Sequence, residues 1–170
     1  MRQPDLLGES CDTRPMKPVL LLALLSFAAH ADDLEARLDQ VAAVHGGAGP
    51  FAVAGYRMAL YALKVLVLEP GSFDLEVEHR SPKAVQYACI ADGAQAATRV
   101  SVGKLSLRWV EAPIEATETV YLKRSTGQKV VLKPAASFLK AFSNLPMEKS
   151  RENGRKVLAL PDSQIFEVAR

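Results

Sequence analysis

Two separated segments of the chain hold most of the residues that could bind a ligand or take part in a reaction. The first reads HGGAGPF over residues 45–51 and continues into GYRM over 55–58, and the second reads CIADGAQAAT over 89–98 with Gly103-Lys104 soon after. Together they offer an imidazole from His45, a thiol from Cys89 and a carboxylate from Asp92. Imidazole and thiolate are the usual protein ligands of zinc. These segments are therefore the candidates for a metal or ligand site.

The spacing within the second segment would place several polar groups on one side of a helix. Its composition is typical of a helix, and Cys89 and Asp92 are three positions apart, so their side chains would face the same way. Asp92 could then ligate a metal or orient another ligand. Gln95 continues the same line by another three positions, and Thr98 and Lys104 could hold a loop or an anion near it.

The order and spacing of these motifs resemble the FmdE family, which takes its name from formylmethanofuran dehydrogenase. The core pattern of that family is His-Gly-His-x-x-Pro, then Gly-Tyr-Arg-Met, then Cys-x-x-Asp-x-x-Gln-x-x-Thr and a Gly-Lys pair. The resemblance covers residues 45–104, and the general layout extends from residue 33 to the end of the chain. It implies a mixed-sheet α+β domain with a metal site, often zinc.

The resemblance also assigns roles to single residues. It implies that His45 and Cys89 are metal ligands and that zinc is the cofactor. The remaining motif positions become candidate ligand-binding residues, namely Tyr56, Arg57, Asp92, Gln95, Thr98 and Lys104.

Two positions depart from the family pattern. Gly47 stands where the family has its second His, and Val100 stands where a further Cys is frequent. Structural zinc takes about four protein ligands and catalytic zinc about three, whereas this chain offers His45, Cys89 and at most Asp92. Two binding functions therefore stay open, a metal or small-ligand site and a metal-free module that binds a ligand or a protein. A hydrolase or redox enzyme that uses Cys89 or a bound metal is a third reading, supported by no nucleophile motif or phosphate loop.

Each of these residues also has a purely structural interpretation. His45 could sit at a helix C-terminus, where a cation suits the helix dipole. Cys89 could be a buried small hydrophobic residue, as free cysteines often are. Arg57 lies in an apolar helical stretch and needs a partner, for which Asp92 or Glu69 are available.

The hydrophobic pattern predicts a single α+β domain that begins with helices, and the resemblance implies that these N-terminal helices pack on a mixed β-sheet. We expect helices over 33–44, 51–66, 83–97, 138–145 and 148–158, and strands over 73–77, 105–109, 119–123, 129–133 and 166–168. Ser125-Thr126-Gly127, between the third and fourth of these strands, predicts a hairpin with a short Gly-containing loop. The stretch 51–66 is apolar nearly all round, which is typical of a buried helix. His79 follows the first strand in a polar tail, so we expect it to be solvated.

The N-terminus carries the pattern of a secretory signal peptide. Met16-Lys17 provides a positive start, residues 19–29 are apolar, and Ala29-His30-Ala31 provides small residues for cleavage. This predicts a pre-sequence over residues 1–31, with the signal peptide at 16–31, and a domain over residues 32–170 that is periplasmic or secreted. The apolar run is about half of the ~20 residues that a membrane-spanning helix needs, so the mature form should have no transmembrane helix.

Composition narrows the class of partner. The chain has a net charge of +2, one Trp and no basic cluster, so we expect no binding to nucleic acid. After cleavage Cys89 is the one remaining cysteine, and no internal disulfide can form. A metal or a small ligand is the expected partner, and a homodimer is possible.

Overall fold

The computed structural model describes residues 18–169. The expected signal-peptide start at Met16 lies outside the described residues. The chain divides into two compact units between Asp32 and Asp33. Helix α1 (Pro18–His45) has its first residues in one unit and its last residues in the other. No helix within the described part of the chain is both long and apolar enough to cross a membrane.

The second unit alternates helices and strands after the end of α1. In chain order its elements are α2 (Pro50–Leu66), β1 (Leu75–Ser81), α3 (Val85–Thr98), the short 3₁₀ helix η1 (Val102–Lys104), β2 (Leu107–Glu111), η2 (Ile114–Ala116), β3 (Glu118–Lys123), β4 (Lys129–Pro134), α4 (Ala136–Phe142), η3 (Met147–Lys149), α5 (Ser150–Ala159), α6 (Asp162–Ile165) and β5 (Phe166–Val168).

The strands form one mixed sheet in the order β2-β1-β3-β4-β5. Strands β1 and β2 are parallel, and α3 makes the crossover between them, as a parallel pair requires. The other neighbours pair antiparallel, with β3 and β4 joined by the predicted tight turn around Gly127. The predicted α+β class and mixed sheet are confirmed.

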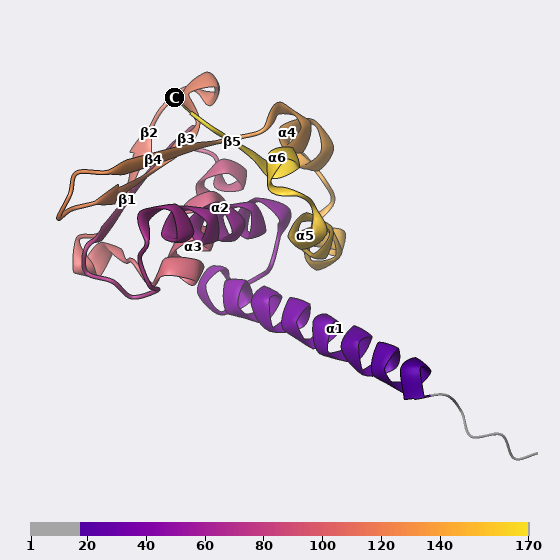
Figure 1. Ribbon diagram of the computed structural model, residues 1–170. Coiled ribbons are helices and arrows are strands. Elements are labelled where there is room, and N and C mark those ends of the chain that lie inside the picture. Colours follow the sequence, from indigo (N-terminus) through magenta and orange to yellow (C-terminus); the bar gives the residue numbers. More distant parts are fainter. Residues whose placement is uncertain (1–17, 170) are drawn as a thin grey trace, which may run out of the picture. The chain divides into compact units, whose positions relative to one another are not determined.

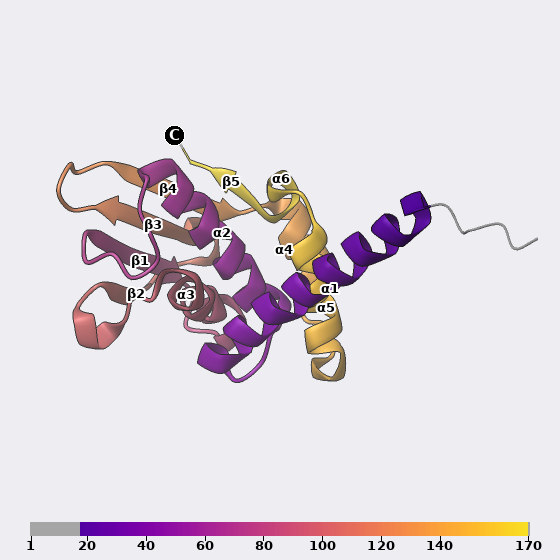
Figure 2. The same cartoon turned by 60° about the horizontal axis from the view of Figure 1, so that its bottom comes forward.

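Helices α2 and α3 pack closely against each other on one face of the sheet (Figures 1 and 2). Pro50 begins α2 at a position where its missing N–H costs no hydrogen bond. Most of α2 is buried, including Val53, Ala54 and Met58, so the predicted buried helix is confirmed. Helix α5 packs along another side of α2.

The position of His79 corrects one expectation. Strand β1 continues to Ser81, and its alternate residues Leu75, Val77, His79 and Ser81 are all buried. The imidazole of His79 is fully buried, with Nδ1 2.9 Å from the hydroxyl of Thr119 and Nε2 3.1 Å from the carbonyl oxygen of Tyr87. It is not solvated, because β1 continues to Ser81, four residues beyond the end at residue 77 that the sequence pattern indicated. Burial lowers its pKa to about 4.

Candidate functional site

The site begins at His45, the last residue of α1. Its Nδ1 lies 2.7 Å from Oδ2 of Asp92 on α3. The helix can stop here because Gly46 takes a φ of 83°, a region that glycine adopts without steric cost. The N–H of Gly46 donates to the carbonyl oxygen of Ala42 at 2.8 Å. This turn leads the chain from His45 to the start of α2.

His45 is held as a cation by its neighbours. The hydrogen bond with Asp92 raises its pKa most, the contact with Cys89 raises it further, and burial works against both, so that the pKa rises to about 10. At neutral pH the pair is therefore an imidazolium whose Nδ1–H donates to a carboxylate. The two charges balance within the pair.

Cys89 lies one helical turn before Asp92 on α3 and is 9% exposed. Its thiol donates to the carbonyl oxygen of Val85 at 2.9 Å, and Cys89 lines the same pocket as His45. The structure thus brings together His45, Cys89 and Asp92, although 44 residues separate the first two in the sequence. The three-residue spacing places Cys89 and Asp92 on one face of α3, as expected.

The donor set decides how far a resident metal fits. No group of three or more His, Cys, Asp or Glu side chains within residues 18–169 is arranged to hold a metal ion. One carboxylate oxygen of Asp92 already accepts a hydrogen bond from His45, Gly47 has no side chain, and Val100 is packed in the core. His45 and Cys89 alone do not fit the four protein ligands of structural zinc or the three of catalytic zinc.

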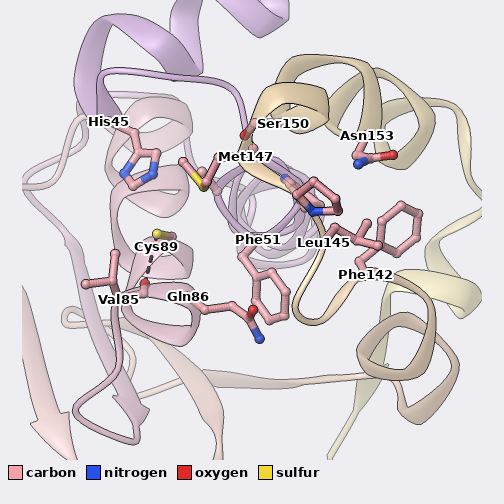
Figure 3. Close-up of a pocket in the computed structure, with 14 residues that line it drawn as sticks. His45, Phe51, Val85, Gln86, Cys89, Phe142, Leu145, Met147, Ser150 and Asn153 are labelled. Atoms are coloured by element: carbon pink, nitrogen blue, oxygen red, sulfur yellow. Dashed lines mark hydrogen bonds between the residues drawn. The ribbon is translucent and has the colours of Figure 1, made fainter.

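A pocket of about 260 Å³ opens beside His45 and Cys89 (Figure 3). His45, Cys89 and Val85 lie on one side of it, and Phe142, Leu145 and Asn153 lie on the other. Phe51 lies at its centre and packs edge-to-face against Phe138 and Tyr87. Rigid aromatic walls with a few polar groups are characteristic of small-molecule sites.

The far wall of this pocket was not expected from the sequence. It comes from the end of α4, the loop that follows it, η3 and the beginning of α5, which contribute Phe142, Leu145, Pro146, Met147, Ser150 and Asn153. Their loop is tied to α3 because the backbone N–H of Asn144 donates to Oε1 of Gln86 at 2.9 Å. The sequence signal was a set of apolar residues in a Pro- and Asn-containing loop, which by itself indicates no particular contact.

A second hollow of about 240 Å³ shares His45 and Cys89 with this pocket. It is lined by His45, Cys89 and Asp92 together with Trp109 of β2. The indole N–H of Trp109 donates to the hydroxyl of Ser81 at 2.8 Å, which fixes the ring against the neighbouring strand. His45 and Cys89 thus line both hollows, whereas Asp92 lines only the second.

Tyr56 and Arg57, both expected at the ligand site, instead make hydrogen bonds that join neighbouring elements of the fold. The hydroxyl of Tyr56 donates to Oε1 of Gln40 at 2.9 Å, and Nε2 of Gln40 donates to the carbonyl oxygen of Ala96. This chain of bonds joins the end of α1 to α2 and α3. Neither Tyr56 nor Arg57 lines the pocket beside His45.

Arg57 has a different partner from the two that the sequence suggested. Its guanidinium donates to the carbonyl oxygen of Leu158, at the end of α5, and at 2.6 Å to the carboxylate of Asp162. Pairing with Asp92 or Glu69 was therefore wrong. Arg57 stabilises the C-terminal end of α5, where unpaired carbonyl groups accumulate.

Of the remaining candidates, Gln95 and Thr98 lie further along α3 and Lys104 lies in η1, and none of them lines either hollow. Thr98 is buried, and its hydroxyl donates to the carbonyl oxygen of Ala94 at 2.6 Å. Lys104 is exposed, and its ammonium donates to the carbonyl oxygen of Arg99 at 2.9 Å. Gln95 is half-buried one turn beyond Asp92. The structure brings none of the three to the His45 pocket.

The residues that form this site lie within a match to a known protein family. Residues 44–167 match the family model FmdE, described as "Molybdenum formylmethanofuran dehydrogenase operon". This range covers most of the chain and includes His45, Cys89 and Asp92, so the chain belongs to the FmdE family. No curated protein matches the chain.

Proposed function

We propose that this member of the FmdE family is a binding module whose pocket holds a small, largely apolar organic ligand beside His45, Cys89 and Asp92. The observation that carries the proposal is the position of the reactive groups. The imidazole and the thiol line an apolar pocket of about 260 Å³, where a ligand would meet both a hydrophobic wall and polar groups.

The energetics favour an apolar ligand. Burial of apolar surface contributes roughly 25 cal/mol per Å², and the aromatic wall is already held in place by Phe138 and Tyr87. A preformed wall lowers the entropic cost of binding. The hydrogen bond with Asp92 uses Nδ1 of His45, so Nε2 is left to contact the polar part of the ligand.

Binding of zinc is a second candidate function, favoured by one specific observation. A carboxylate that accepts from one imidazole nitrogen is the usual support for a histidine that ligates a metal through the other, and Asp92 holds His45 in this way. His45 and Cys89 would then be the protein ligands, and exogenous groups would supply the rest. Such a site would be weak and open.

The apolar-ligand proposal is tested with hexan-1-ol as a neutral probe in isothermal titration calorimetry. Leu145→Asp places a charge in the pocket wall, and we expect it to weaken binding about tenfold because a charged group resists contact with an apolar tail. Val67→Asp is the matched control, since Val67 is exposed and lies at the other end of α2. Equal binding by both variants, or no binding by the parent chain, would refute the proposal.

The zinc candidate is tested by a separate titration with zinc ions. Cys89→Ser should weaken binding, and Gly47→His should tighten it, since a side chain at position 47 meets nothing within 4 Å. Lys104→Ala is the control, because Lys104 contacts neither hollow. If the parent binds no zinc and Gly47→His gains none, residues 45–49 are only a helix-joining loop and the metal candidate is withdrawn.

We also propose that the chain is exported and cleaved after Ala31, on the basis of the Ala29-His30-Ala31 pattern. Intact-mass measurement of protein from a periplasmic extract should give a chain that begins at Asp32. A product that retains residues 19–29 in the membrane fraction would rule this out.

A further inference from the structure

The polar side chains of the pocket beside His45 present donors to a ligand. Oε1 of Gln86 accepts from the N–H of Asn144 at 2.9 Å, and Oδ1 of Asn153 accepts from the ammonium of Lys156 at 3.4 Å. Asn153 is 6% exposed, and its Nδ2 has no hydrogen-bond partner among the described residues. The protein thus uses the acceptor end of both amides and leaves the N–H₂ ends available to the pocket.

The N-terminal end of α2 adds backbone donors at the same place. Gly49 precedes the helix and provides no side-chain cap. The N–H of Val53 bonds to the carbonyl oxygen of Gly49, whereas Ala52 and Phe51, one and two residues earlier, have no helical partner for their N–H groups. Figure 3 looks along α2 from this end, with the pocket in front of it. The positive end of the helix dipole therefore faces the pocket.

No fixed charge opposes these donors. The residues that line the pocket include no Asp, Glu, Lys or Arg. Asp92 lines the neighbouring hollow, and its carboxylate is balanced by His45. The pocket therefore combines an apolar wall with a polar side that is rich in donors and free of carboxylates.

Building on the proposed binding function, we propose that this pocket selects a small organic anion, namely a carboxylate head on a short apolar tail. The amide groups of Gln86 and Asn153 and the first N–H groups of α2 bind the head, and Phe51, Phe142 and Leu145 contact the tail. The pocket volume of about 260 Å³ corresponds to roughly nine water-sized groups at ~30 Å³ each. A chain the length of hexanoate is therefore a suitable probe.

A series with one tail and three heads tests the charge preference. Hexanoate, hexanamide and hexylammonium are titrated into the full chain by calorimetry at constant ionic strength. We expect hexanoate to bind about tenfold more tightly than hexanamide and hexylammonium to bind most weakly, because donors in a partly enclosed site favour a negative head. Acetate, which lacks the tail, should bind more weakly than hexanoate.

Substitution at Met147 locates the binding to this pocket. Met147 lines the pocket and is 80% exposed, so Met147→Glu and Met147→Gln should both fold. The Glu variant adds a carboxylate where the Gln variant adds a neutral group of the same shape. We expect Met147→Glu to weaken hexanoate about tenfold relative to Met147→Gln and to strengthen hexylammonium.

The outcomes separate this inference from the function on which it rests. If hexanamide or hexylammonium equals hexanoate, the pocket still binds apolar ligands but the preference for an anion is overturned. If hexanoate binds equally to both Met147 variants, it binds elsewhere and the inference is likewise overturned. If none of the three tailed probes binds, the proposed function fails together with the inference.

Discussion

His45 connects the two motif segments, because its imidazole bonds to Asp92 on α3 and lines the same pocket as Cys89. The chain contains three histidines, at positions 30, 45 and 79. Two of them have opposite environments in the described structure. An ion pair raises the pKa of His45, and burial lowers the pKa of His79.

We predict that NMR titration of the histidine ring protons will show His45 as the most basic ring in the chain, with a pKa of about 10. Asp92→Asn removes the largest cause of the shift, so the pKa of His45 should fall by more than about one unit towards its ordinary value. Asp162→Asn is the control, since Asp162 pairs with Arg57 instead. A parent His45 that titrates near its ordinary value would show that the ion pair does not form in solution.

Because His79 is buried as a neutral ring, we predict that the protein loses stability in mild acid. Burial keeps the folded ring neutral at pH 7, and its proton lies on Nε2 because that atom faces a carbonyl oxygen, which can only accept. The pKa falls from 6.5 in the unfolded chain to about 4 in the folded chain. The stability that depends on the neutral, buried ring of His79 is therefore fully present above pH 6.5. It is lost as the pH falls towards 4, by roughly 3 kcal/mol in all.

Urea denaturation at several pH values between 7 and 4 measures this effect. The comparison is with His79→Gln, which retains hydrogen-bonding groups but does not titrate. The difference in unfolding free energy between the two proteins should shrink as the pH falls through that range. A difference that stays constant would show that His79 is accessible to protons in the folded state.

The crossing of α2 and α3 is the element that positions the site. A Cβ added at Gly93 would lie 1.8 Å from the carbonyl oxygen of Ala52, and one added at Gly55 would lie 2.1 Å from that of Ile90. The two backbones therefore touch at these glycines. Gly55 begins the motif Gly-Tyr-Arg-Met, and Gly93 directly follows Asp92 in the second segment. This contact holds Cys89 and Asp92 in place.

Gly93→Ala should consequently destabilise the domain, even though alanine is the better helix former by about 1 kcal/mol. Separation of the two helices costs more than this gain, and we expect a net loss of roughly 1–3 kcal/mol in the free energy of unfolding. Gly103→Ala is the matched control, because a Cβ there meets nothing within 4 Å. Equal melting temperatures for both variants would contradict the close crossing.

Local patterns predicted the elements better than the contacts between them. The apolar stretch of residues 51–66 and the hairpin around Gly127 depend on neighbouring residues alone, and both are found. His79 was misplaced because the polar residues of β1 suggested that the strand had ended. The alternation of β1 in fact continues, and it places His79 on the same buried face as Val77.

The site itself could be predicted only in part. The spacing of Cys89 and Asp92 places them together on any helix, whereas the approach of His45 was implied only by the resemblance to the FmdE family. The wall that includes Phe142 and Met147 depends on a tertiary contact, the bond from Asn144 to Gln86. No periodicity in the sequence connects two segments so far apart.

For the whole molecule, the central claim is that the end of α1, the beginnings of α2 and α3 and the loop before α5 surround one ligand site. Titration of the ¹⁵N-labelled chain with hexan-1-ol, followed by backbone amide NMR, tests this claim most directly. We predict that the shifting amides cluster at residues 45–52, 85–89 and 142–153, the three segments that line the pocket. Shifts confined to the opposite face of the sheet, around Glu76 and Arg108, would contradict the account.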